Sequence, residues 1–212
     1  MTLTEILDLL TKEIHSVVIA TTHEGKPVTR VIDVMMHDEQ TFYFLTAKGK
    51  AFYEELMDQK YIALTGMCSG EAYNKKEASL HMKAISVRGE IENVKTEHLD
   101  DIFERNPYMA DIYPTKESRQ ALEVFKMTKG SGEVFDLSTK PITRFTFTIG
   151  SEKQETSGYA INDHCVGCEE CVKVCPTNCI QHETIPFVID NTHCLHCGNC
   201  LAVCHFQAVE KF

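Results

Sequence analysis

The cysteines of this 212-residue chain are concentrated at one end, and their spacing constrains the fold more than any other feature. Only one of the ten cysteines, Cys68, lies within residues 1–150. Eight of the others form two runs with the same spacing, C-x2-C-x2-C-x3-C, in the segments 164–180 and 193–209. The two segments align at a constant offset of 29 residues, which makes them an internal repeat. The chain therefore joins two regions with different chemistry.

A polar stretch separates these regions. The sequence GSEKQETSG is flanked by glycine and contains no apolar side chain, which is typical of a linker. We therefore predict a first domain over 1–150, a linker over 151–158 and a second domain over 159–212.

The repeated spacing is the one that binds 4Fe-4S clusters. Three cysteines two residues apart wrap around one cluster, and the fourth cysteine of each run ligates the other cluster. Zinc sites usually use two C-x2-C pairs separated by a longer loop, and disulfides are rare inside cells, so both are disfavoured here. The predicted ligand sets are Cys165, Cys168, Cys171 and Cys204 for one cluster, and Cys194, Cys197, Cys200 and Cys175 for the other. Over about 159–212 the chain resembles the bacterial two-cluster ferredoxins, which implies a small α+β domain.

Two positions depart from that pattern. His205 stands where the second run would have a proline, which is expected to change the local turn and leave ligation intact. Cys179 stands where the second repeat has Ala208, and we interpret it as a small buried thiol, with ligand exchange or a redox role as the alternative. The histidines next to the ligands, His164, His193 and His196, are expected to face solvent or to contact the ligands without binding iron.

Charge and hydropathy exclude several classes of function. The formal net charge is −10 and the pI is near 5.4, which argues against nucleic-acid binding and against a basic membrane-binding surface. No run of eighteen apolar residues is present to span a bilayer. The first ten residues match an amphipathic helix with Thr2 and Glu5 as a capping box, and they lack the features of a signal peptide. We therefore expect a cytoplasmic protein.

Short strands dominate the first domain. Apolar and β-branched residues alternate over several segments that are separated by Gly, Pro and Asn turns. The segment 142–149 shows the pattern best, with Phe145, Phe147 and Ile149 on one face. The fold class we predict is mainly β, a barrel with flanking helices. The expected strands are 16–22, 28–36, 41–46, 61–68, 80–94, 121–128, 133–137 and 142–149, with a helix over 47–59 and a polar loop over 69–79.

The order of these elements resembles the pyridoxamine-phosphate-oxidase-like split β-barrel family. The resemblance covers roughly residues 5–150 and is carried by ATTHEGKPVTRVID (20–33), FYFLTAKGKAFYEEL (42–56), YIALTG (61–66) and SVRGEIENV (86–94). It implies a split barrel that binds FMN at the interface of a homodimer.

A cationic turn supplies the expected phosphate site. Thr46, Lys48, Gly49 and Lys50 lie between a strand end and a helix start, where backbone N–H groups and the helix dipole favour an anion. By resemblance, Arg30 contacts the flavin, the backbone at Val31 and Ile32 contacts its ring, and Arg88 assists with an anion. The alternatives are solvated turn lysines and an Arg30 ion pair with a neighbouring acid.

The function follows from the two halves together. The first domain lacks a G-x-G-x-x-G nucleotide motif, a Walker motif and a nucleophile–base–acid set, which is compatible with a flavin that carries the chemistry. We predict an FMN-dependent oxidoreductase whose two 4Fe-4S clusters pass single electrons to or from FMN, with a small-molecule substrate and a protein electron donor or acceptor. Catalytic side chains are not identifiable from the sequence. The alternatives are a non-catalytic electron carrier, a redox sensor, and a barrel that binds haem or a deazaflavin.

Overall fold

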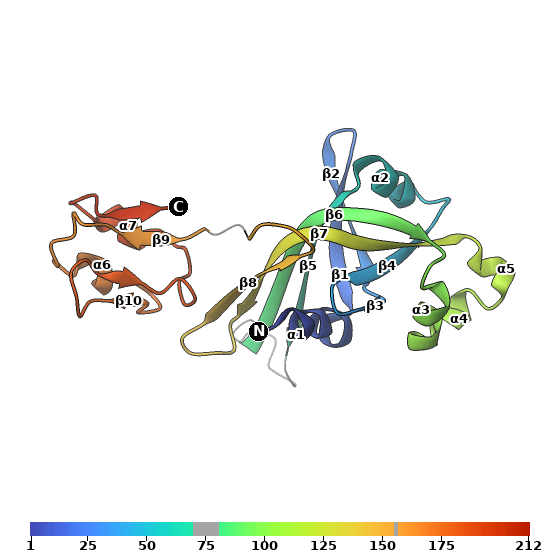
Figure 1. Cartoon of the computed structure of the whole chain (residues 1–212), viewed down its shortest axis with the longest axis horizontal. Helices are drawn as coiled ribbons and strands as arrows, with labels where there is room; N and C mark the ends of the chain where they lie inside the picture. The colour runs from blue at the N-terminus through green and yellow to red at the C-terminus, as the bar shows by residue number, and fades with distance from the viewer. Residues whose placement is uncertain (70–80, 155–156) are drawn as a thin grey trace. The chain divides into compact units, whose positions relative to one another are not determined.

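A computed structural model of the chain describes residues 1–69, 81–154 and 157–212 and shows two compact units (Figure 1). One unit contains residues 1–68, 84–134 and 146–154. The other contains 135–145, the described residues of 155–212 and those of 69–83. The predicted loop over 69–79 lies almost entirely outside the described residues.

The first unit is built on a large antiparallel sheet, so the prediction of a mainly β fold is confirmed. Among the described residues the strand order is β2-β1-β5-β6-β7-β4-β3, and β8 also pairs with β7. The strands are β1 (Ser16–His23), β2 (Lys26–Asp33), β3 (Met36–His37), β4 (Phe42–Ala47), β5 (Tyr61–Ser69), β6 (Met82–Lys95), β7 (Leu122–Asp136) and β8 (Thr143–Ile149).

Buried and exposed side chains alternate along the strands, so one face of the sheet packs on the core. In β1, Val17 and Ile19 are almost fully buried, whereas Val18 between them is 41% exposed. The inner face packs around large aromatic residues, and the rings of Phe44 and Phe125 stack at a centroid distance of 5.6 Å. Burial of these apolar side chains is the main stabilising contribution to the unit.

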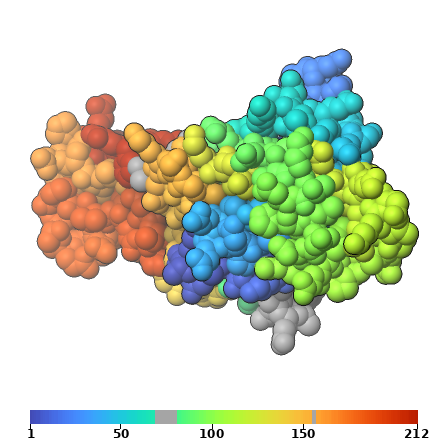
Figure 2. Space-filling view, turned by 45° about the vertical axis from the view of Figure 1, so that its right-hand side comes forward, coloured from blue at the N-terminus to red at the C-terminus, as the bar shows by residue number. Residues whose placement is uncertain are grey.

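Helices cover the edges of this core. At the N-terminus α1 (Leu3–Asp8) has the predicted capping box of Thr2 and Glu5, and it continues as a π-helical segment, η1 (Leu9–Ile14). Further along the chain are α2 (Ala51–Gln59), α3 (Leu99–Arg105), α4 (Met109–Ile112) and α5 (Lys116–Arg119). Figure 2 shows the tip of the β1–β2 hairpin, in blue, projecting beside α2, in cyan. The cationic turn described below lies between β4 and α2.

The prediction of two strands over 121–128 and 133–137 is wrong in one respect, because β7 runs through both without a break. Glycine between two apolar segments usually indicates a turn, yet Gly132 lies within β7. A Cβ atom there would be 2.6 Å from the carbonyl oxygen of Ser86 and 2.5 Å from the ring of Phe147. Glycine therefore serves close packing at this position.

The second unit is small, and its core contains cysteines. Its elements are β9 (Tyr159–Ile161), α6 (Glu170–Lys173), β10 (Ile180–Gln181), β11 (Val188–Ile189), α7 (Asn199–Val203) and β12 (Val209–Lys211). Strand β9 pairs with β12, and β10 pairs with β11. A handful of apolar side chains, including Tyr159, Phe187 and Ile189, pack with the buried cysteines. A core this small usually needs a disulfide or a metal to be stable.

The described helices include none with the length and apolar character that a membrane crossing requires.

Candidate functional site

Four cysteines of the first predicted ligand set line one cavity in the second unit. Cys165, Cys168 and Cys171 come from the loop before α6 and from α6 itself, and Cys204 follows α7. The cavity is otherwise lined by apolar side chains such as Phe187 and by two glutamates.

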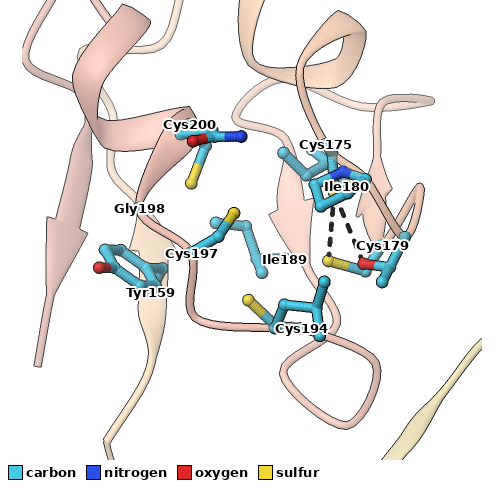
Figure 3. A pocket seen from close by; sticks show the side chains of 13 residues that line it. Tyr159, Cys175, Cys179, Ile180, Ile189, Cys194, Cys197, Gly198 and Cys200 are labelled. Atoms are coloured by element: carbon cyan, nitrogen blue, oxygen red, sulfur yellow. Dashed lines mark hydrogen bonds between the residues drawn. The ribbon is translucent and has the colours of Figure 1, made fainter. Parts of the chain in front are cut away.

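The second set lines a separate cavity (Figure 3). Cys194, Cys197 and Cys200 approach it from the loop before α7 and from α7, and Cys175 approaches from the chain after α6. Each cavity therefore takes three cysteines from one repeat and the fourth from the other, as the spacing predicts.

Left-handed residues shape both cysteine loops. Glu169 (φ 64°) caps the start of α6, and Gly198 (φ 78°) occupies the equivalent position before α7. This conformation turns the chain sharply between the second and third cysteine, so that three sulfur atoms face one cavity. The helix that follows is only four or five residues long, and it delivers the fourth cysteine to the other cavity.

The sulfur atoms are arranged around cavities and not around a single point. Within residues 1–69, 81–154 and 157–212, no group of three His, Cys, Asp or Glu side chains converges on a position for one metal ion. The cysteine sets have the chemistry that a four-iron cluster requires, so these residues fit such a group.

Cys179 lies directly beside one predicted ligand. Its Sγ atom is 3.5 Å from Sγ of Cys175, and the hydroxyl of Thr177 is 3.7 Å from the same sulfur (Figure 3). Burial raises the pKa of Cys179 well above its usual value, so this side chain stays a thiol. Burial acts in the same direction on Cys175, but hydrogen bonds from the backbone of Cys179 and Thr177 outweigh it and lower the pKa of Cys175.

The histidines of the second repeat are engaged by the turn region of the β7–β8 hairpin, residues 135–145, which belongs to the same unit. Nδ1 of His193 lies 2.7 Å from the carbonyl oxygen of Ile142. Nη1 of Arg144 lies 2.6 Å from Nδ1 and 2.9 Å from Nε2 of His196. In the first repeat, His164 is exposed. Sequence reasoning missed Arg144, because nothing in a strand pattern indicates which loop the end of a strand will meet.

The cationic turn of the first unit lies between β4 and α2, as predicted. Thr46 is buried at the end of β4, whereas Lys48, Gly49 and Lys50 are exposed, and Lys50 is the N-cap of α2. The unpaired N–H groups at a helix start and two exposed ammonium groups suit a phosphate.

Arg30 reaches the same helix from β2. Its guanidinium lies 4.3 Å from the ring centroid of Phe52, and it donates to Glu55 at 2.7 Å and to the hydroxyl of Thr21 at 2.9 Å. The structure thus brings Arg30 to the first turns of α2 and also gives it the acidic neighbour that the sequence left as an alternative. Glu55 was missed, although an acid between the apolar Phe52 and Leu56 was a visible signal.

The other residues that the sequence predicts to contact the flavin lie on β2 and β6. Val31 is 71% exposed and Ile32 is half-buried on β2, while Arg88 is exposed on β6. Asp33, at the end of β2, accepts hydrogen bonds from Ser16 and Tyr108.

The buried Arg30–Glu55 pair makes stability depend on pH. Burial acts to raise the pKa of Glu55, but hydrogen bonds from Thr21 and Arg30 outweigh it and hold this pKa below its ordinary value of 4.5. A lowered pKa means that the stabilisation is complete above pH 4.5 and is lost as the pH falls below it. We expect Glu55→Gln to lower the free energy of unfolding by about 1–3 kcal/mol at pH 7.

Denaturant unfolding of both proteins at pH 7 and pH 4 checks this, and the difference between them should shrink at the lower pH. Glu54→Gln, an exposed neighbour on α2, is the control and should differ little from the parent at either pH. A difference for Glu55→Gln that stays constant with pH would contradict the assignment.

Comparison with known families matches both regions. The family model described as pyridoxamine 5'-phosphate oxidase matches residues 3–131, and the model described as 4Fe-4S dicluster domain matches residues 164–208. No curated protein matches the chain.

Solved structures resemble the barrel. A NimC/NimA family protein from Clostridium acetobutylicum has 20% identity and a TM-score of 0.55, over 69% of this chain and 91% of that one. A protein related to general stress protein 26, of the pyridoxinephosphate oxidase family and from the same organism, has 16% identity and a TM-score of 0.46, over 63% and 84%. The first of these likenesses supports the fold alone.

Proposed function

The chain belongs to the pyridoxamine 5'-phosphate oxidase family and carries a 4Fe-4S dicluster domain, and from this we propose that it is an FMN-dependent oxidoreductase supplied with electrons by its own clusters. The observation that carries the proposal is the pair of cavities, each lined by the four cysteines of one predicted ligand set, in the same chain as a split barrel. A domain of this kind transfers single electrons, so it requires a second redox centre that accepts or supplies them.

We assign one cluster to Cys165, Cys168, Cys171 and Cys204 and the other to Cys194, Cys197, Cys200 and Cys175. The eight thiols supply the ligands, and the apolar side chains around them limit the access of water. Thiolate ligation of this kind favours a reducing compartment, so we propose a cytoplasmic location.

For FMN we propose that the phosphate binds at the cationic turn. The N–H groups at the start of α2 and the side chains of Thr46, Lys48 and Lys50 supply donors and positive charge, and Gly49 leaves the turn open, since no atom lies within 4 Å of the position of a Cβ. Arg30 adds a fixed guanidinium beside the same helix, with Glu55 and Thr21 holding its orientation. When bound, FMN exchanges electrons singly with clusters and in pairs with a substrate.

The outer face of the sheet supports a homodimer with the flavin at its interface. Val31 of β2 pairs in register with Val18 of β1, which is in turn opposite Thr65 of β5. Val31 and Val18, which adjoin each other, are 71% and 41% exposed, and Met67, two residues beyond Thr65 on β5, is 61% exposed, so exposed apolar side chains lie on one face of three neighbouring strands. Exposed apolar faces of this kind mark interaction sites, and a second copy of the chain covers such a face symmetrically.

Anaerobic purification with chemical analysis tests the proposal. We expect about eight iron atoms and a similar amount of acid-labile sulfide per chain, because each cluster holds four of each. We also expect one FMN, lost on the double replacement Lys48→Ala and Lys50→Ala. Zinc without sulfide would refute the cluster assignment, and full flavin occupancy in the double variant would refute the phosphate site. Oxidation of the bound flavin by added small molecules under anaerobic conditions then separates an enzyme from an electron carrier.

A further inference from the structure

The two cysteine repeats have the same ligands but different surroundings, and this difference carries an inference that rests on the proposed clusters. We propose that Arg144, together with the side chains that distinguish the repeats, makes the cluster site of Cys175, Cys194, Cys197 and Cys200 the more easily reduced of the two. The reduction potential of a cluster rises with positive charge and with hydrogen bonds to its sulfurs.

Arg144 brings a permanent positive charge to the loop of the second repeat. Its backbone N–H donates to the carbonyl of Thr192 at 2.8 Å, and its guanidinium donates to the ring of His196. The backbone N–H of His196 in turn donates to Sγ of Cys194 at 3.4 Å. One residue thus contacts the loop through both its backbone and its guanidinium, which stays protonated, and His196 links it to a ligand sulfur.

The equivalent loop of the first repeat carries negative charge instead. Glu169 and Glu170 line the cavity of Cys165, and the positions 29 residues later are the neutral Gly198 and Asn199. Lys173 pairs with Glu170 at 2.7 Å, so it offsets one of the two charges. Added negative charge disfavours the reduced form of the neighbouring cluster, although solvent screens these exposed groups in part.

Side-chain donors differ in the same direction. The hydroxyl of Thr177 and the thiol of Cys179 both lie within hydrogen-bond distance of the Cys175 sulfur. The repeat-equivalent residues near Cys204 are Phe206 and Ala208, whose side chains donate no hydrogen bond. The charges and the side-chain donors therefore favour the reduced state at the site that contains Cys175 and Cys194, while each site also has a backbone N–H on a ligand sulfur, from His196 to Cys194 and from Ala208 to Cys204.

With both clusters bound, the thiols of Cys175, Cys194, Cys197 and Cys200 would hold the cluster that accepts the first electron. The thiols of Cys165, Cys168, Cys171 and Cys204 would hold the one that gives up its electron more readily. Transfer of one electron from the second of these sites to the first would then be downhill, with no bond made or broken.

The test is an anaerobic redox titration of the full holoprotein, followed by electron paramagnetic resonance to obtain both potentials. Arg144→Gln should lower the higher potential and leave the lower one in place, whereas Arg144→Lys, which keeps the charge, should shift it much less. The double variant Glu169→Gln and Glu170→Gln should raise the lower potential only. Lys140→Gln removes one charge from the same hairpin at an exposed position and is the matched control, with both potentials unchanged.

Each outcome has a separate meaning. If Arg144→Gln shifts the lower potential or neither, while iron and sulfide analysis shows both clusters, this inference fails and the proposed function stands. If the parent protein binds no cluster, both fail. Arg144→Gln retains the backbone hydrogen bond to Thr192, and its iron content gives an independent measure that the loop is intact.

Discussion

Replacing Cys204 with alanine is expected to remove the cluster whose other three ligands lie in the first repeat, and the iron content should fall from about eight to about four atoms per chain. The reason is the crossed arrangement of the cavities, in which Cys204 faces Cys165, Cys168 and Cys171. Buried cysteines also make up much of the small core of this unit. The unit should therefore lose part of its stability when the cluster is lost.

Double replacements show whether the ligands cross between repeats. Cys204→Ala combined with Cys171→Ala should still retain about four iron atoms, because both changes affect the same cluster. Cys204→Ala combined with Cys200→Ala should lose nearly all iron, because each change affects a different one. Anaerobic iron and sulfide assays measure both. The opposite result would place each cluster within one repeat, and Cys68→Ala, in the first unit, should leave the iron content unchanged.

A charge at Val31, the most exposed of the apolar side chains on the outer face of β2, β1 and β5, is expected to separate the proposed dimer. Val31→Asp replaces a side chain that is 71% exposed in the single chain, so it should not disturb the barrel itself. A two-fold interface contains the substitution twice, and burying two carboxylates in place of two valines should cost about 3 kcal/mol or more, which is roughly a hundredfold weaker association. Flavin bound at the interface should be lost with it.

Sedimentation and flavin absorbance, measured on the same samples, check this result. Ile112→Asp is the control, because Ile112 is also apolar and 63% exposed but lies on α4. It should remain a dimer with full flavin. A Val31→Asp protein that stays dimeric and retains its flavin would move the interface to another face of the barrel.

Local patterns predicted most of what lies within one repeat or one strand. The alternation of residues 142–149 and the capping box of Thr2 depend on neighbours a few residues away, and both are present in the structure. The cysteine spacing predicted even a contact between repeats, because a cluster has fixed geometry and leaves a thiolate few choices.

The features that could not be predicted depend on distant contacts. The continuity of β7 through Gly130 and Gly132 depends on how closely β6 approaches, which no local signal reports. The pairing of Arg30 with Glu55 and of Arg144 with His196 joins residues 25 and 52 positions apart. Charged side chains have many potential partners, and only the assembled sheet selects one of them.

The crossed ligand sets also bear on the order of events during protein synthesis. A ribosome makes Cys165, Cys168, Cys171 and Cys175 well before Cys200 and Cys204, so neither cavity is complete while the first repeat emerges. The early thiols, including Cys175 and Cys179 with their sulfurs 3.5 Å apart in the folded unit, must stay reduced and unoccupied until the second repeat has been translated. Insertion of the clusters is therefore a late step for this chain. Its free thiols are most easily oxidised during translation, before the clusters are in place.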